Sequence, residues 1–264
     1  MDFILKRYLA KSKKGRYMTG NVFLDTLKCQ KDKKQFGGIY HKTQIELTYN
    51  SNHIKGSALS HEQTKYIFET FTKNDQQNIS GDDELIETVN HFRCVDYVIE
   101  NAQKPLTPKM LKHLHYLLKN GTNDSKKDWF VVGDYKFLPN EISCIETCPP
   151  EMVDFQIKKL LANYNKTKHK TLEQILEFHE KFERIHPFQD GNGRIGRLIM
   201  FKECLANNLT PFIIDAKHKM DYYHGLDAWR DGDRKKLIAT CKNCQQQYQC
   251  LFDELSQENT LANF

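Results

Sequence analysis

The chain has 264 residues, with 39 Lys and Arg against 34 Asp and Glu and a formal net charge of +5. This length can bury a sizeable core in one domain, with or without appendages. No apolar stretch approaches the roughly 18 residues of a membrane-spanning helix, which excludes an integral membrane protein of the helical type. The mild charge, without clustered alternation of aromatic and basic residues, does not indicate a nucleic-acid reader.

The N-terminus and the cysteines indicate the compartment. The apolar run after Met1 is too short for a secretion signal. Eight cysteines in a chain without such a signal are typical of free thiols in a reducing compartment. We therefore expect a cytoplasmic protein with neither a membrane nor a nucleic acid among its partners.

The first half of the chain is expected to be helical. Between Glu84 and Glu100, apolar side chains recur at helical spacing. A second helix opens where Thr107 can cap the N-terminus and Pro108 stands in the first turn. Gly121 is expected to stop it.

Residues 129–147 are the exception to the helical pattern. The run from Trp129 to Phe137 is rich in aromatic and β-branched residues. Pro139 and Asn140 indicate a turn, and residues 142–145 a returning strand. This pattern predicts a β-hairpin, which could also be a surface hairpin packed only for stability.

Helices are expected again over residues 151–164, 172–185, 222–229 and 235–255. The helix over 172–185 is amphipathic, and Pro187 should end it because the residue before a proline is pushed out of the α region. A further helix is expected from Arg194 onward, where apolar residues recur. The fold class predicted is all-α with one β-hairpin.

The segment between the helices on either side of Pro187 carries the most chemistry. Two glycines, Gly191 and Gly193, come directly before the N-terminus of the expected helix, where free N–H groups and the helix dipole favour an anion. Cations at such an end oppose the dipole, so Arg194 and Arg197 suit a bound polyanion. Alone, each feature is more often a turn or a solvated helix face. Their coincidence within twelve residues favours a phosphate site.

Two more side chains complete this site. His186 is the nearby group able to take a proton near neutral pH. Asp190 suits Mg²⁺, which takes one or two carboxylates together with substrate phosphates. The cysteines at Cys241, Cys244 and Cys250 hint at zinc, but the second pair that a zinc site needs is missing, which favours buried helix cysteines.

Residues 186–197 match in full the signature H-x-F-x-[DE]-G-N-G-R-x-x-R, so the chain resembles the Fic family. In looser form the resemblance covers about residues 40–250. It implies a Fic-type helical domain with a β-hairpin flap, residues 129–147, over the active site. It also implies an N-terminal helical region (1–60), a catalytic core (61–210) and C-terminal helices (211–264).

The function implied by the resemblance is protein adenylyltransferase activity, which moves AMP from Mg²⁺-ATP to a Ser, Thr or Tyr hydroxyl of a target protein and releases pyrophosphate. Self-modification and a homo-oligomer are further expectations. Two alternatives stay open: a phosphotransferase or other nucleotide-derived group transfer, and a non-catalytic, nucleotide-gated peptide-binding module.

The resemblance also implies residue roles. His186 would be the base and Asp190 the metal ligand. The phosphates would lie against Gly191, Asn192, Gly193, Arg194 (β-phosphate) and Arg197 (γ-phosphate). The flap residues expected to bind the target are Tyr135, Lys136, Phe137 and Leu138.

The stretch from Ser51 to Gly56 resembles the family's inhibitory pattern, [ST]-x-x-x-E-[GN], with Lys55 at the glutamate position. In relatives the glutamate pairs with the second arginine of the motif, here Arg197. Lys55 should repel Arg197 instead, so we expect the chain to be released from autoinhibition. A glutamate at this position would be expected to restore the ion pair.

Overall fold

The computed structural model describes residues 20–71, 82–142 and 145–261. Its helices run in chain order as α2 (Val22–Asp32), α3 (Ile39–Lys55), α4 (His61–Phe71), α5 (Asp83–Glu100), α6 (Pro108–Lys119), α7 (Pro150–Tyr164), α8 (Leu172–Ile185), α9 (Asn192–Ala206), α10 (Lys219–Arg230) and α11 (Lys235–Leu261). Two strands of two residues, β1 (Glu141–Ile142) and β2 (Ile145–Glu146), pair antiparallel. The predicted all-α class is confirmed.

Local sequence signals set several helix ends. Thr107 accepts a hydrogen bond from the backbone of Met110 at the start of α6, with Pro108 in the first turn. Thr171 and Gln174 form a capping box at the start of α8. Gly56 ends α3 with φ of 117°, a left-handed conformation that a glycine adopts without steric cost.

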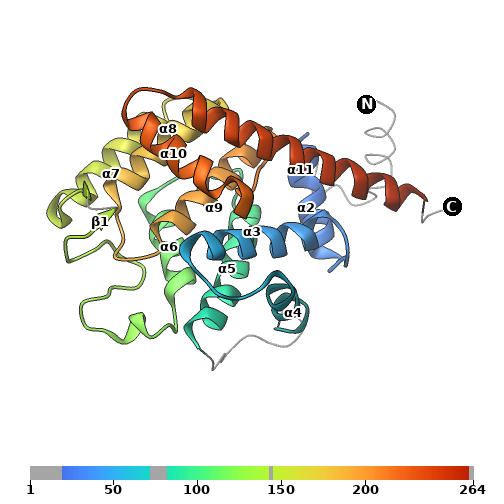
Figure 1. Cartoon of the computed structure of the whole chain (residues 1–264), viewed down its shortest axis with the longest axis horizontal. Helices are drawn as coiled ribbons and strands as arrows, with labels where there is room; N and C mark the ends of the chain where they lie inside the picture. Colours follow the sequence, from blue (N-terminus) through green and yellow to red (C-terminus); the bar gives the residue numbers. More distant parts are fainter. Residues whose placement is uncertain (1–19, 72–81, 143–144, 262–264) are drawn as a thin grey trace.

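Helix α9 lies at the centre of the domain and is buried along nearly its whole length. It packs against α3, α5, α6 and α8 (Figure 1), and its apolar side chains belong to the main core. Burial on all sides fits its apolar middle, and the two charged residues that follow, Lys202 and Glu203, are buried as an ion pair. The N-terminus of α9 is thereby fixed among three neighbouring helices.

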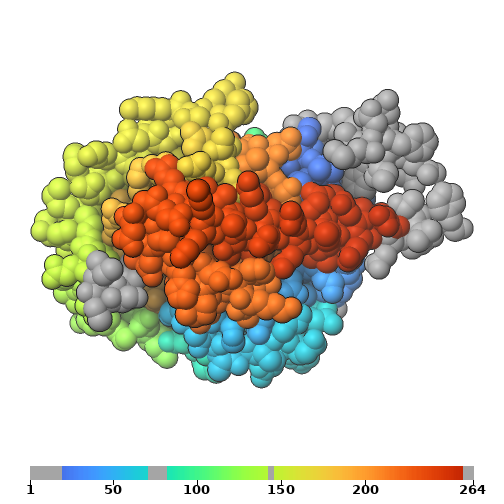
Figure 2. Space-filling view, turned by 45° about the horizontal axis from the view of Figure 1, so that its top comes forward, coloured from blue at the N-terminus to red at the C-terminus, as the bar shows by residue number. Residues whose placement is uncertain are grey.

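The C-terminal helices cover one face of this core. Helix α11 packs against α10, α8 and α3 and forms a long ridge in the space-filling view (Figure 2). Cys241 and Cys244 of α11 are buried in a second apolar cluster with Trp229 of α10. None of the described helices carries an apolar stretch long enough to cross a lipid bilayer.

The strand predicted over residues 129–137 is wrong, because this segment forms turns and irregular backbone. Its backbone groups bond elsewhere: Gly133 N–H donates to Nδ1 of His115, and Lys136 N–H donates to the carbonyl of Pro187. Of the aromatic side chains that suggested a strand, Phe130 is buried in the core, whereas Trp129 and Phe137 are exposed. Pairing is limited to β1 and β2, where Glu141 faces Glu146.

Candidate active site

His186 lies at the C-terminal end of α8 in a left-handed conformation, with φ of 51°. This conformation is uncommon for a residue with a side chain and clusters at functional sites. Its N–H donates to the carbonyl of Phe182, and its Nδ1 lies 3.2 Å from the carbonyl oxygen of Glu183. Because a carbonyl only accepts, Nδ1 carries the proton and Nε2 keeps its lone pair.

The surroundings keep this imidazole neutral. Burial lowers the pKa of His186 to about 4, and the charge of Lys136 acts in the same direction. The hydrogen bond to Glu183 and the charge of Asp190 oppose the shift but do not cancel it. At neutral pH the ring is therefore an acceptor at Nε2.

The loop after Pro187 is braced from inside. The side chain of Asn192 accepts a hydrogen bond from Phe188 N–H at 2.8 Å and donates one to Phe188 O at 2.7 Å. Phe188 is fully buried, and His115 stacks on its ring at 4.3 Å between centroids. The side-chain amide of Asn192 is thus already bonded to the loop. The group that Asn192 can offer to an anion is its backbone N–H.

Gly191 turns the chain into α9. Its φ is 87°, and a Cβ at this position would lie 3.0 Å from a methyl group of Leu118. Both the conformation and the close approach require glycine. The turn brings the first N–H groups of α9, which have no partner within the helix, to the open end of the loop.

Asp190 lies in a cluster of charges drawn from four parts of the fold. Its Oδ2 accepts from Lys55 at 2.9 Å, from Lys119 at 2.8 Å and from Arg194 at 3.2 Å. Burial raises the pKa of Asp190, but the three cations outweigh it and hold that pKa well below its usual range. The carboxylate is therefore ionised at any physiological pH.

Glu87 and Asp124 complete this cluster. Arg194 donates to both oxygens of Glu87, at 2.6 and 3.3 Å, and its side chain is 1% exposed. Lys119 lies within 3.0 Å of one oxygen each of Glu87, Asp124 and Asp190. Lys127 also pairs with Asp124, at 2.7 Å, so three carboxylates face four cations. The positive charge that opposes the dipole of α9 thus has negative partners within the chain.

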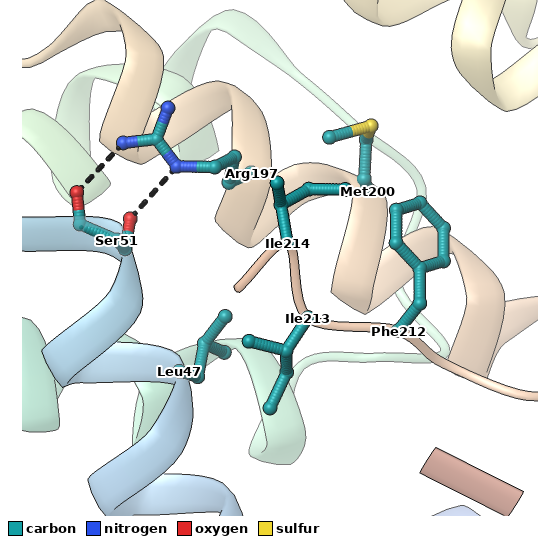
Figure 3. A pocket seen from close by; sticks show the side chains of 7 residues that line it. All are labelled: Leu47, Ser51, Arg197, Met200, Phe212, Ile213 and Ile214. Atoms are coloured by element: carbon teal, nitrogen blue, oxygen red, sulfur yellow. Dashed lines mark hydrogen bonds between the residues drawn. The ribbon is translucent and has the colours of Figure 1, made fainter. Parts of the chain in front are cut away.

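Arg197 has different partners. Its Nε donates to Ser51 Oγ at 3.0 Å and its Nη2 to Ser51 O at 2.9 Å. Figure 3 shows the guanidinium turned toward Ser51 on α3, away from the apolar side chains that line the small pocket beside it (Leu47, Met200, Phe212, Ile213 and Ile214). Helix α3 is therefore joined to α9 at this point.

The expected position of Lys55 needs correction. Ser51 reaches Arg197 as the pattern implied, but the ammonium of Lys55, one turn further, bonds to Asp190 and lies 3.9 Å from Glu87. Lys55 faces the predicted metal ligand because the α3 helix places residues 51 and 55 over different parts of the loop. The repulsion expected between Lys55 and Arg197 is replaced by an attraction to Asp190.

The segment expected to form the flap lies against the motif even though it is not a strand. Lys136 N–H donates to Pro187 O, Leu138 N–H to the side chain of Gln189, and the Asn140 amide to Phe188 O. The Lys136 ammonium donates to Asn140, Thr147 and the carbonyl of Ile185. Phe137 and Leu138 remain exposed, at 66% and 46%.

The structure brings the residues from His186 to Arg197 together with Lys55 and Lys136, and adds others. Glu87 on α5 and Lys119 on α6 take part in the charge cluster, although no sequence motif contains either residue. Each lies near the end of a segment whose sequence pattern predicts a helix and nothing more. A charged residue on an otherwise apolar helix face was the one signal available for Lys119.

Together these features define a class of protein: an all-helical domain that presents a glycine-rich loop and a histidine at the junction of two helices. Residues 105–204 match the model of the Fic/DOC family. The matched region contains the whole segment from His186 to Arg197.

Similar proteins agree with this match to the Fic/DOC family. The chain is 24% identical over 206 residues to the protein adenylyltransferase Fic of Aedes aegypti and 24% identical over 203 residues to that of Nematostella vectensis. These alignments cover 76% and 74% of the chain but 40% and 45% of the relatives. The chain thus spans less than half the length of these relatives.

Solved structures show the same fold. A Fic domain containing signaling protein from Bacteroides thetaiotaomicron superposes with a TM-score of 0.69 at 22% identity, covering 89% of this chain and 98% of the other. Fic-1 of C. elegans gives a TM-score of 0.66 at 18% identity, covering 89% and 72%.

Proposed function

We propose that this chain is a protein adenylyltransferase that transfers AMP from ATP to a Ser, Thr or Tyr hydroxyl of a target protein and releases pyrophosphate. The observation that carries the proposal is the imidazole of His186: it is neutral, its Nδ1 is fixed on the Glu183 carbonyl, and its Nε2 is left as a base beside a glycine-rich helix N-terminus. The relatives' name, protein adenylyltransferase Fic, supports the same chemistry.

In the proposed reaction the hydroxyl oxygen attacks the α-phosphorus of ATP. The bond from that phosphorus to the bridging oxygen breaks, and pyrophosphate leaves. His186 Nε2 takes the hydroxyl proton as the new bond forms. The negative phosphates near His186 would raise its pKa from about 4 toward the working pH, which makes it a better base when the nucleotide is bound.

The loop and the arginines would hold the phosphates. The N–H groups of Gly191, Asn192 and Gly193 point from the N-terminus of α9, a favourable place for phosphate oxygens. Arg194 and Arg197 are proposed for the β- and γ-phosphates. Both are engaged within the chain, on Glu87 and Ser51, so each would have to share or exchange its partner when ATP binds.

Asp190 is the proposed ligand of Mg²⁺. The site fits a divalent cation because the carboxylate of Asp190 is ionised and its Oδ1 accepts no hydrogen bond from another described residue. No group of three or more His, Cys, Asp or Glu in the described ranges could hold a metal by itself, so phosphates would supply the other ligands. A bound Mg²⁺ would neutralise charge on the phosphates.

The segment from Tyr135 to Leu138 is proposed to receive the target. Its hydrogen bonds to Pro187 and Gln189 fix it beside the loop, while Phe137 and Leu138 offer exposed apolar side chains. A target with a hydroxyl presented next to His186 would lie along this segment. The same arrangement admits self-modification.

Radiolabelled ATP tests the proposal. With α-labelled ATP and Mg²⁺, with or without lysate, wild-type protein should label a target or itself, whereas γ-labelled ATP should not. The His186→Ala variant should bind ATP but lose about 10²–10⁴-fold in transfer. The His169→Ala variant, at an exposed histidine outside the site, is the control.

Near-normal labelling by the His186→Ala variant would refute the base role. Labelling from γ-labelled ATP instead would favour the phosphotransferase alternative. ATP binding without label from either nucleotide would favour a peptide-binding module.

A further inference from the structure

The cations around Asp190 differ in how firmly they are held. The side chains of Lys119 and Arg194 are each 1% exposed; the first contacts three carboxylates and the second bonds to both oxygens of Glu87. Lys55 is 41% exposed and bonds closely to Asp190 alone. Of the cations bonded to Asp190, Lys55 is therefore the one that can leave without burying an unpaired charge.

The charges of the cluster also bear on metal binding. Glu87, Asp124 and Asp190 carry three negative charges, and Lys55, Lys119, Lys127 and Arg194 carry four positive ones, so the net charge is +1. A cluster with a net positive charge repels a divalent cation. Without Lys55 the same groups sum to zero, and one face of Asp190 Oδ2 becomes free.

Helix α3 holds Lys55 in this position. Ser51, one turn earlier, is bonded twice to Arg197, which anchors α3 on α9. Gly56 then ends the helix, with its N–H donating to Asn52 O and His53 O. The backbone at Lys55 is thus fixed from both sides, and only its side chain can move.

We propose that Lys55 is a tethered cation that occupies Asp190 in the free protein and competes with a divalent metal ion for that carboxylate. The inference rests on the proposed function, because it takes Asp190 to be the metal ligand. Tethering keeps the ammonium at a high local concentration, so a free metal ion displaces it only with help from bound phosphates. The displaced ammonium stays at the mouth of the site, within reach of those phosphates.

The consequence is that metal and nucleotide bind together. Metal alone binds weakly because Lys55 already neutralises Asp190. A nucleotide supplies further oxygen ligands for the metal and an alternative anion for the lysine. Lys55 thereby makes the loading of the site depend on the nucleotide.

Mn²⁺ alone is the probe, measured by the loss of the free-ion signal in electron paramagnetic resonance without nucleotide. We expect Lys55→Met to bind Mn²⁺ at least about tenfold more tightly than wild type, because a unit positive charge has left the metal's position. Lys55→Arg keeps the charge and should bind as weakly as wild type.

Lys42→Met is the matched control. Lys42 is an exposed lysine on the same helix, roughly 20 Å away at the rise of an α-helix, so its loss lowers the net charge equally but outside the site. It should leave Mn²⁺ affinity as in wild type. Thermal unfolding of each variant verifies that it is folded.

Several results would overturn the competition: Mn²⁺ affinity of Lys55→Met equal to or weaker than that of wild type, equal tightening in Lys55→Arg, or equal tightening in Lys42→Met. Such a result with intact AMP transfer would leave the proposed function standing. Tighter Mn²⁺ binding by Lys55→Met alone, with no AMP transfer by wild type, would support the competition and refute the proposed function.

Discussion

The two ends of the segment from His186 to Arg197 control charge in different ways. At His186, burial keeps a titratable group neutral, and a backbone carbonyl fixes which ring nitrogen carries the proton. Around Asp190 and Arg194, three carboxylates and four cations stay charged because each lies against a group of opposite charge. One end is thus prepared to accept a proton, and the other to exchange one ion for another.

This difference has an energetic consequence. A neutral imidazole held by backbone groups can be replaced without leaving an unpaired charge. A buried ion cannot, since its partners lose their compensation. Substitutions at the histidine end should therefore change chemistry with little effect on stability, whereas substitutions in the charge cluster should affect both.

The largest effect is expected for Arg194→Met, which leaves Glu87 and Asp190 short of a buried cation. We expect a loss of about 3–5 kcal/mol in the free energy of unfolding, measured by urea denaturation. Lys158, which pairs with Asp154 on α7 where the two side chains are 64% and 53% exposed, provides the control: Lys158→Met should cost less than about 1 kcal/mol. Equal losses in the two variants would show that the cluster contributes no more than a surface pair.

The junction between the two ends depends on Asn192. In Asn192→Ala the buried N–H of Phe188 loses its partner, and the carbonyl of Phe188 keeps only the amide of Asn140, which should cost about 1–3 kcal/mol in the free energy of unfolding. Asn192→Asp keeps the acceptor for Phe188 N–H but places a buried carboxylate oxygen against the Phe188 carbonyl, so it should also be destabilising. If neither variant is destabilised in calorimetry, the loop is not braced by this side chain.

The histidine end makes a prediction about pH. The pKa of His186 is about 4 in the folded protein and near 6.5 when unfolded, so between these values the unfolded state binds more protons. Stability from the neutral ring is present above pH 6.5 and is lost as pH falls toward 4, by up to about 1.4 kcal/mol per pH unit.

Comparing the pH dependence of unfolding in wild type and His186→Gln isolates this contribution, and NMR titration of the ring gives its pKa directly. A ring that titrates near 6.5 would contradict the neutral, buried base.

The smallest effect on stability is expected at Phe137, which is 66% exposed beside the loop. Phe137→Ala should change the free energy of unfolding by less than about 0.5 kcal/mol and leave ATP binding unchanged, while target labelling falls. Phe155→Ala removes an equally exposed phenylalanine from α7 and should leave labelling intact. Equal labelling by both variants would argue against a target contact at Phe137.

Much of the helical framework could be predicted because its signals are local. The N-cap of Thr107, the proline at 108, the capping residues before α8 and the break at Pro187 all act within a few residues of the helix ends they set. The segment from His186 to Arg197 likewise carries its own chemistry in consecutive residues. These features needed no knowledge of the rest of the chain.

Long-range contacts could not be predicted in the same way. The aromatic run from Trp129 to Phe137 suggested a strand, but its backbone N–H groups donate hydrogen bonds to His115 and Pro187 instead of to a partner strand. Glu87, Lys119 and Lys55 reach Asp190 from three helices far apart in the sequence. By itself the sequence determined which groups can hold a phosphate and a proton. Only the packing of α3, α5 and α6 around α9 decided which charge lies against which, because electrostatic pairing depends on distance in space.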